Sequence, residues 1–204
     1  MGSRPPLLSL AIVTTVLTYT WILAPITPRW TALVAGVIVL ALAVWRAWTS
    51  DEWGLAPSHF RPSLQRTAIF TAAAAAVLGV AGWLHGSWHA RTLTVPDLAI
   101  LALWALGQQF ALQIALLREL QAASSRTIGV VIAAVLFAAL HLPNPFLSTV
   151  TLVAALAWCR IYDRHPHVIP LALSHTLLTI VVLTALDDSA TGRLRVGIVY
   201  LARH

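Results

Sequence analysis

The segment GQQFALQ, residues 107–113, carries three side-chain amides within an otherwise apolar stretch. Gln109 and Gln113 are four residues apart and therefore share one face of a helix, while Gln108 lies about 100° round the axis. An amide can donate and accept hydrogen bonds but cannot take up a proton. These glutamines can therefore orient a substrate or a water, and none of them can serve as a general base.

Two histidines stand in apolar surroundings elsewhere in the chain. His141 follows the run IGVVIAAVLFAAL, and His175 lies in a second apolar run with Thr179 one helical turn further on. Burial favours neutral imidazole, and a neutral imidazole can accept or donate a proton near neutral pH. We expect both histidines to meet the glutamines in one buried site, with His141 and His175 as an acid–base pair.

The composition indicates whether the helices that position these residues lie in water or in a membrane. The chain has 204 residues, of which 59% are hydrophobic and 10% charged. A soluble domain of this size cannot bury so much apolar surface, so we predict one all-α domain over residues 1–204 in a membrane. The apolar runs predict seven spanning helices, at residues 7–26, 30–48, 67–86, 98–120, 128–141, 146–162 and 169–186. The polar stretch 49–66 is interpreted as a loop along the surface.

All 13 basic residues are arginines, and their distribution predicts the orientation. With seven spans, one side of the membrane holds eight of them and the other holds two outside the C-terminal tail. We therefore expect an inner-membrane protein with a cytoplasmic N-terminus. Scattered arginines are a poor nucleic-acid surface, so no nucleic-acid partner is expected. The eight are Arg4, Arg46, Arg61, Arg66, Arg118, Arg126, Arg160 and Arg164; the two are Arg29 and Arg91, and the tail adds Arg193, Arg195 and Arg203.

The predicted fifth span is short. Its 14 residues would extend about 21 Å as a helix, and the two prolines of LPNP end it directly after His141. His141 should therefore lie at a helix end below the membrane surface. Broken backbone at that depth is tolerated only inside protein or beside a water-filled cavity, and such breaks often line substrate sites.

Simpler interpretations also exist for each of these residues. A glutamine in a spanning helix often joins helices through a hydrogen bond worth about 0.6–2 kcal/mol, and a lone membrane histidine is often a structural donor. Three amides within six residues, with two histidines on other helices, favour a functional site. His165 and His167, in RHPHV, are interpreted as parts of a solvated loop.

Together these residues resemble the CAAX-protease and bacteriocin-processing (CPBP) family of intramembrane endopeptidases. The family pattern is Glu-Glu-x-x-x-Arg, then Phe-x-x-x-His, then His-x-x-x-Asn. This chain has Gln108-Gln109-x-x-x-Gln113, an intact Phe137-x-x-x-His141 followed by LPNP, and His175-x-x-x-Thr179. The resemblance covers residues 98–180, and WGL at residues 53–55 is similar to a short motif that often precedes this core.

The resemblance implies a hydrolase-like site, but its carboxylates are absent here. Gln109 and Gln113 replace a Glu and its Arg partner together, a joint change that avoids leaving one charge alone in low dielectric. With the glutamate base gone, we expect His141 and His175 to be catalytic with Gln108 and Gln109. Gln113, Phe137 and Thr179, at the remaining motif positions, should contact the substrate.

Three interpretations of function remain open. The first is a diverged enzyme acting on a membrane-resident substrate, a lipidated peptide or an isoprenoid-like molecule, without any cofactor. The second is a catalytically silent relative, a pseudoprotease that binds a membrane substrate or protein partner as chaperone, scaffold or immunity factor. The third is a metal site at His141 and His175, which we do not expect because two histidines and amides are a poor ligand set for Zn²⁺.

Overall fold

The computed structural model describes residues 6–28, 30–89 and 91–202, and within them the regular secondary structure is helical. The order is α1 (Leu7–Thr18), the π-helix η1 (Tyr19–Leu23), α2 (Thr31–Ser50), α3 (Pro57–Leu84), α4 (Val95–Phe110), the π-helix η2 (Ala111–Leu117), α5 (Arg118–Ala123), α6 (Arg126–Ala139), α7 (Pro145–Arg164), α8 (Val168–Ala185), α9 (Asp188–Thr191), the 3-10 helix η3 (Gly192–Leu194) and α10 (Ile198–Leu201).

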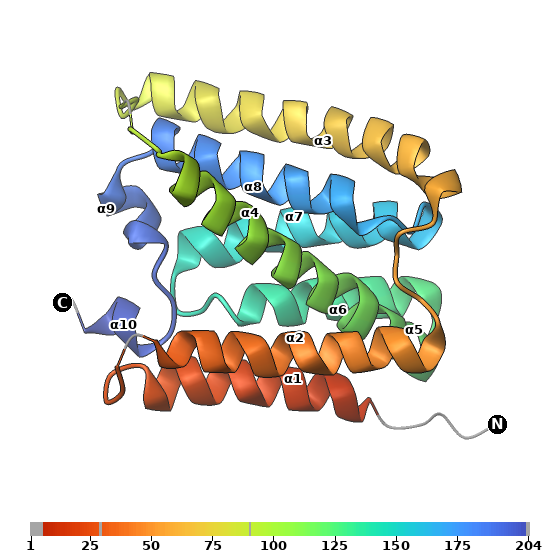
Figure 1. Ribbon diagram of the computed structural model, residues 1–204. Coiled ribbons are helices and arrows are strands. Elements are labelled where there is room, and N and C mark those ends of the chain that lie inside the picture. The colour runs from red at the N-terminus through yellow and green to blue at the C-terminus, as the bar shows by residue number, and fades with distance from the viewer. Residues whose placement is uncertain (1–5, 29, 90, 203–204) are drawn as a thin grey trace.

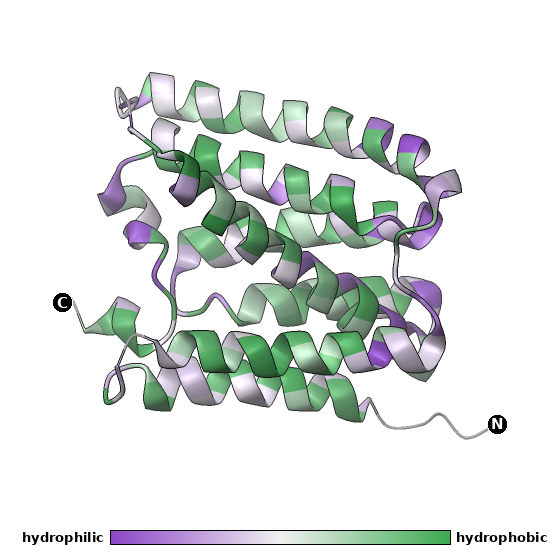
Figure 2. Ribbon diagram, in the orientation of Figure 1, coloured by the Kyte–Doolittle hydropathy of each residue, from purple (hydrophilic) through white to green (hydrophobic). Residues whose placement is uncertain are grey.

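The long helices run roughly along one common direction (Figure 1). α1 packs beside α2, α3 beside α8 and α6 beside α7, while α4 crosses the bundle obliquely and packs on α8. Apolar residues cover most of the length of these helices and polar residues concentrate at their ends (Figure 2). An apolar band of this kind is the pattern expected of helices that cross a lipid bilayer.

The seven predicted apolar helices are all present. Five helices are long and apolar enough to span a membrane, and the two shorter ones are residues 7–23 and 126–139. Large apolar side chains face outward, as Ile69 and Val77 of α3 do with 68% and 69% exposure. A water-soluble protein would not expose so much apolar surface, so an all-α polytopic membrane bundle is the fold.

One boundary differs from the expectation. The stretch 49–66 was interpreted as a surface loop, but α3 begins at Pro57, and only residues 51–56 connect α2 to α3. Pro57 is tolerated because it occupies the first helical position, where the missing N–H would have no partner. Pro62 lies further inside the helix, and its ring did not prevent helix formation here. Polarity of the first turns indicates where the helix leaves the apolar region, not where it starts.

The predicted fourth span is one continuous helical segment with a π-helical middle. α4 begins at a capping box in which Thr94 accepts from the Asp97 backbone and Asp97 accepts from the Thr94 backbone. All seven residues of η2 are buried, and α5 continues the helix to Ala123. A π-helical turn inside an α-helix is uncommon and is found mostly at functional sites.

The break after His141 is covered by the C-terminal segment of the chain. α6 ends at Ala139, as the prolines predict, and Asn144 caps the start of α7 by accepting from the Leu147 N–H at 3.0 Å. The Asn144 amide also donates to the carbonyls of Thr191 and Arg195, at 2.9 and 3.1 Å. The buried Asn144 side chain, 1% exposed, thus connects the break to the C-terminal segment.

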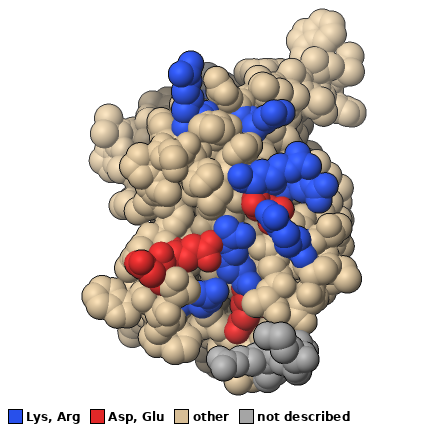
Figure 3. All heavy atoms as spheres, turned by 90° about the vertical axis from the view of Figure 1, so that its right-hand side faces the viewer, with Lys and Arg blue, Asp and Glu red and all other residues tan. Residues whose placement is uncertain are grey.

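Charged residues gather at the end of the bundle that faces the viewer in Figure 3. The end of α2, the start of α3, α5, the start of α6 and the end of α7 all reach this end. They carry seven of the eight arginines assigned to one side, while α9 and α10 lie at the opposite end (Figure 1). Arg4, Arg29 and Arg203, which also entered the orientation argument, lie outside the described residues.

Candidate active site

The middle of α4 and η2 is joined to α8 by a row of hydrogen bonds between neutral side chains. The Gln113 amide donates to the Gln109 oxygen at 3.0 Å, and the Gln109 amide nitrogen lies 3.4 Å from His175 Nδ1. Gln109 and Gln113 are both 0% exposed. An amide nitrogen can only donate, so Nδ1 of His175 accepts, and the proton of the neutral ring resides on Nε2.

His141 has the opposite arrangement. Its Nδ1 lies 2.7 Å from the carbonyl oxygen of Phe137. A carbonyl can only accept, so Nδ1 carries the proton and Nε2 of the neutral ring is left with a free lone pair. The two imidazoles are therefore held in different tautomers, one with a donor and one with an acceptor at Nε2.

Aromatic rings hold the two histidines near each other. The Phe137 ring lies edge-on to His141 at 4.9 Å and edge-on to His175 at 6.3 Å, between ring centroids. Trp158 of α7 stacks on His175 at 4.9 Å with an interplanar angle of 29°. One polar cluster inside an apolar core is thus enclosed by the continuous helix of α4 and η2 and by α6, α7 and α8.

A second row of hydrogen bonds fixes the Trp158 ring. The Trp158 indole N–H donates to Ser174 at 3.0 Å, and the Thr71 hydroxyl of α3 donates to the same Ser174 oxygen at 2.6 Å. Trp158 is 2% exposed and Ser174 is also 2% exposed. The stacking partner of His175 therefore has little rotational freedom, and α3 contributes to positioning the imidazole.

The remaining predicted site residues fall into two kinds. Gln108 is half-buried and makes no hydrogen bond with any residue that the structure describes, so its amide is available to a ligand. Thr179 is half-buried, and its hydroxyl donates to the His175 carbonyl at 2.9 Å, as a threonine often does within a helix. The cluster of Gln109, His141 and His175 is thus assembled as a unit, with Gln108 and Thr179 adjacent to it in the chain.

Trp158 and Cys159 are part of the cluster but were not among the predicted site residues. Trp158 stacks on His175, and the fully buried Cys159 thiol lies beside Gln113. No pattern in the sequence marks either residue, because a tryptophan or a cysteine in an apolar helix is common in the core of a bundle. Their roles arise from the packing of α7 against η2 and α8.

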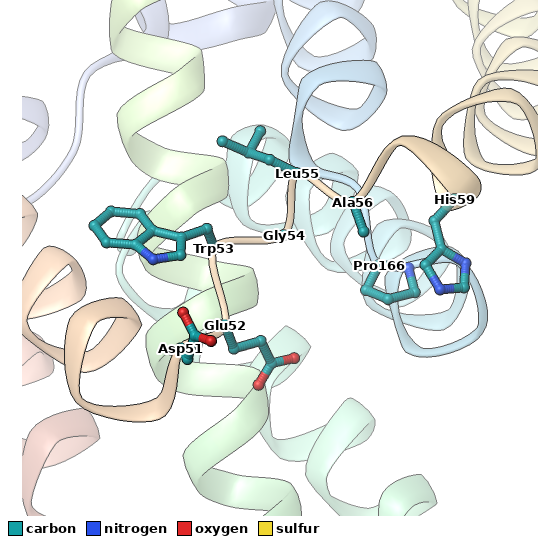
Figure 4. A pocket seen from close by; sticks show the side chains of 8 residues that line it. All are labelled: Asp51, Glu52, Trp53, Gly54, Leu55, Ala56, His59 and Pro166. Atoms are coloured by element: carbon teal, nitrogen blue, oxygen red, sulfur yellow. The ribbon is translucent and has the colours of Figure 1, made fainter.

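The WGL segment lines a hollow of about 380 Å³ at the charged end of the bundle, together with Asp51, Glu52, Ala56, His59 and Pro166 (Figure 4). Trp53 lies 6.4 Å from the ring of Phe110, the neighbour of Gln109 in the chain. Gly54 has φ of 62°, and a Cβ there would lie 2.5 Å from the Tyr162 hydroxyl. WGL is therefore a packed connection between the charged end and the glutamine-bearing helix.

Metal binding would need a third strong ligand beside the two histidines. Over residues 6–28, 30–89 and 91–202, no three His, Cys, Asp or Glu side chains come together in a geometry that could hold an ion. The Gln109 amide, which is the hydrogen-bond partner of the His175 ring, is a weak zinc ligand.

Comparison with known families identifies the core that carries this cluster. Residues 90–181 match the family described as type II CAAX prenyl endopeptidase Rce1-like. The matched range contains Gln108, Gln109, Gln113, His141 and His175. No curated protein and no solved structure matches the chain.

Proposed function

The chain belongs to the CAAX-protease-like (CPBP) family of membrane proteins through residues 90–181, and on that premise we propose that it is an intramembrane enzyme with a neutral His/Gln site. The proposal rests chiefly on the complementary tautomers of His141 and His175. One ring offers a lone pair at Nε2 and the other a proton at Nε2, so the pair can accept and donate a proton without any carboxylate.

The roles follow from what each side chain already bonds. His141 Nε2 would take a proton from a water or from the substrate, and His175 Nε2–H would donate to the oxygen that gains negative charge. Gln109 would act through His175, since its amide nitrogen fixes the tautomer of that ring. Gln108 has a free amide and would bind the substrate or the attacking water. Phe137, Gln113 and Thr179 would shape the surroundings of the substrate.

A membrane-resident substrate suits the position of the cluster. His141 follows the end of α6 and His175 lies on α8, in an apolar bundle whose outer side chains face lipid, so an apolar molecule would reach them from the bilayer. A lipidated peptide or an isoprenoid-like molecule has the required combination of an apolar chain and a polar reacting group. The family's description as a prenyl endopeptidase supports this class.

The test compares membranes from cells that express the wild type with membranes from cells that express His141→Ala plus His175→Ala. Lipids, small apolar metabolites and membrane peptides are analysed by mass spectrometry, with the exposed His85→Ala as control. A product formed by the wild type and the control, and lost in the double variant, is the expected result. Identical profiles at equal abundance of folded protein would reject the enzyme.

The second candidate is a catalytically silent relative that binds a membrane substrate or a protein partner. It is favoured by one observation, since Gln109 and Gln113 are completely buried and the Gln109 amide connects α4 to His175 of α8, as amides that join helices do. This candidate predicts that His141→Ala keeps the cellular function, while Ala138→Trp, which places a large side chain at a buried position of α6 next to Phe137, abolishes it. The enzyme predicts loss of function in both variants.

A further inference from the structure

A second hollow lies at the charged end of the bundle and is lined by none of the candidate site residues. It has a volume of about 180 Å³ and is lined by Arg66 of α3, by Arg160, Ile161 and Arg164 of α7, and by His165. Arg160 and Arg164 are four residues apart and share one face of α7. Three arginine side chains from two helices therefore line one small hollow.

These three arginines have no acidic partner among the residues that the structure describes. Two of the other four arginines at the same end do: Arg118 is paired with Glu52, and Arg126 is paired with Asp163 at 3.0 Å. Charge repulsion between guanidinium groups is normally relieved by a carboxylate, so three unpaired groups around one hollow favour binding of an anion.

The nearest acid in the chain is already occupied. Asp163 stands between Arg160 and Arg164 in sequence, but its carboxylate accepts from Gln121 at 2.8 Å and from Arg126 at 3.0 Å. The acid and the two arginines at the end of α7 thus have different neighbours. Asp163 contacts α5 and α6, whereas Arg160 and Arg164 line the hollow together with Arg66. Asp163 therefore does not neutralise the hollow.

Two general roles of arginine account for only part of this arrangement. A cation in the last turn of a helix stabilises it through the helix dipole, which covers Arg164 but not Arg66 near the start of α3. Arginines that set the orientation of a membrane protein need only lie on the correct side of the membrane, and they can be fully solvated. Neither role requires three arginines of two helices to share a hollow.

We propose that this arginine hollow binds a phosphate group. Guanidinium matches phosphate geometry through paired N–H donors, and basic pockets between helices at a membrane surface take lipid headgroups. The phosphate could be carried by an anionic phospholipid or arrive as the free ion. The lipid is favoured by exposed apolar residues next to the hollow, Ile69 one turn beyond Arg66 and Val153 two turns before Arg160, which are 68% and 58% exposed.

The test uses the full chain purified in detergent and measures ligand binding by native mass spectrometry and by thermal shift. The ligands are phosphatidylglycerol, phosphatidylcholine and inorganic phosphate, each alone. The variant is Arg160→Gln plus Arg164→Gln, and the control is Arg46→Gln plus Arg61→Gln, which removes the same charge at the same end but outside the hollow. Arg66→Gln is a second variant, on the other helix.

Phosphatidylglycerol should bind the wild type and the control, and its affinity should fall about tenfold or more in the double variant, because each charge-assisted hydrogen bond contributes on this scale. Arg66→Gln should weaken binding in the same direction. The same pattern with inorganic phosphate would identify the free ion as the source, whereas binding of phosphatidylglycerol alone would identify the headgroup. Equal binding by the wild type, the variants and the control would overturn the proposal, as would equal loss in the variant and the control.

Discussion

The Gln113 amide donates a 3.0 Å hydrogen bond to the Gln109 oxygen one helical turn earlier, and neither side chain is exposed. These positions correspond to a Glu and an Arg in the CPBP motif that the segment resembles. Two amides keep a hydrogen bond between the positions while removing both charges. Because a single buried charge without its partner costs several kcal/mol, we expect the residue types at the two positions to be coupled physically.

This coupling predicts the outcome of a double-mutant cycle. Gln109→Glu alone and Gln113→Arg alone should each lower the free energy of unfolding by about 3–5 kcal/mol, because each places one unpaired charge in the core. The double variant should recover most of that loss, since the two charges would pair. Thermal unfolding in detergent measures all three. Additive losses would show that the two positions do not interact.

Asn144 is predicted to fasten the C-terminal segment to the break after His141. In Asn144→Asp the Leu147 N–H keeps its acceptor, but the donors to the Thr191 and Arg195 carbonyls are lost. We expect faster hydrogen exchange and proteolysis over residues 187–201 with α7 unchanged. Asn144→Ala should lose the helix cap as well, at about 1 kcal/mol more. Equal protection of the tail in the wild type and Asn144→Asp would contradict this role.

Gly54 and Gly86 form a matched pair for testing the packed WGL segment. Both have positive φ, 62° and 63°, so an alanine at either position costs roughly 1–2 kcal/mol of backbone strain. A Cβ at Gly86 meets nothing within 4 Å, whereas one at Gly54 would clash with Tyr162 and Ile114. Gly54→Ala should therefore lower the free energy of unfolding by about 1–3 kcal/mol more than Gly86→Ala does. Thermal unfolding measures this as a lower melting temperature for Gly54→Ala. Equal losses would mean that the loop moves freely.

His167, between α7 and α8, should make stability depend on pH. Burial, and next the charge of His59, lower the pKa of His167 below its usual value. The unfolded chain then takes up a proton at a higher pH than the folded chain, so stability should fall as the pH drops below about 6.5 and stay flat above it. When the pH is lowered from about 7.5 to about 5.5, the free energy of unfolding of His167→Gln should fall less than that of the wild type.

The control for this measurement is His85→Gln, which removes an exposed imidazole. It should keep the pH dependence of the wild type. A His167→Gln variant that follows the wild type at every pH would show that other groups determine the acid sensitivity.

Much of the architecture was predictable from local patterns. Apolar runs indicated seven helices, and the prolines of LPNP indicated the break after His141, because both signals depend only on neighbouring residues. The start of α3 was missed, since the polarity of residues 57–66 reflects solvent and not the absence of a helix. His167 was interpreted as part of a solvated loop, yet it is 6% exposed, because Phe60 and the turn at Leu55 pack against it.

The sequence by itself determined that the chain is a membrane helical bundle whose residues 90–181 resemble the CAAX-protease-like core, and it led us to propose a histidine as the base of any chemistry. Only the tertiary structure decided which hydrogen-bond partner each imidazole meets, that Trp158 stacks on His175, and which arginines line one hollow. The reason is distance along the chain. Gln109 and His175 are 66 residues apart, and their hydrogen bond depends on how α4 crosses α8, which no local periodicity encodes.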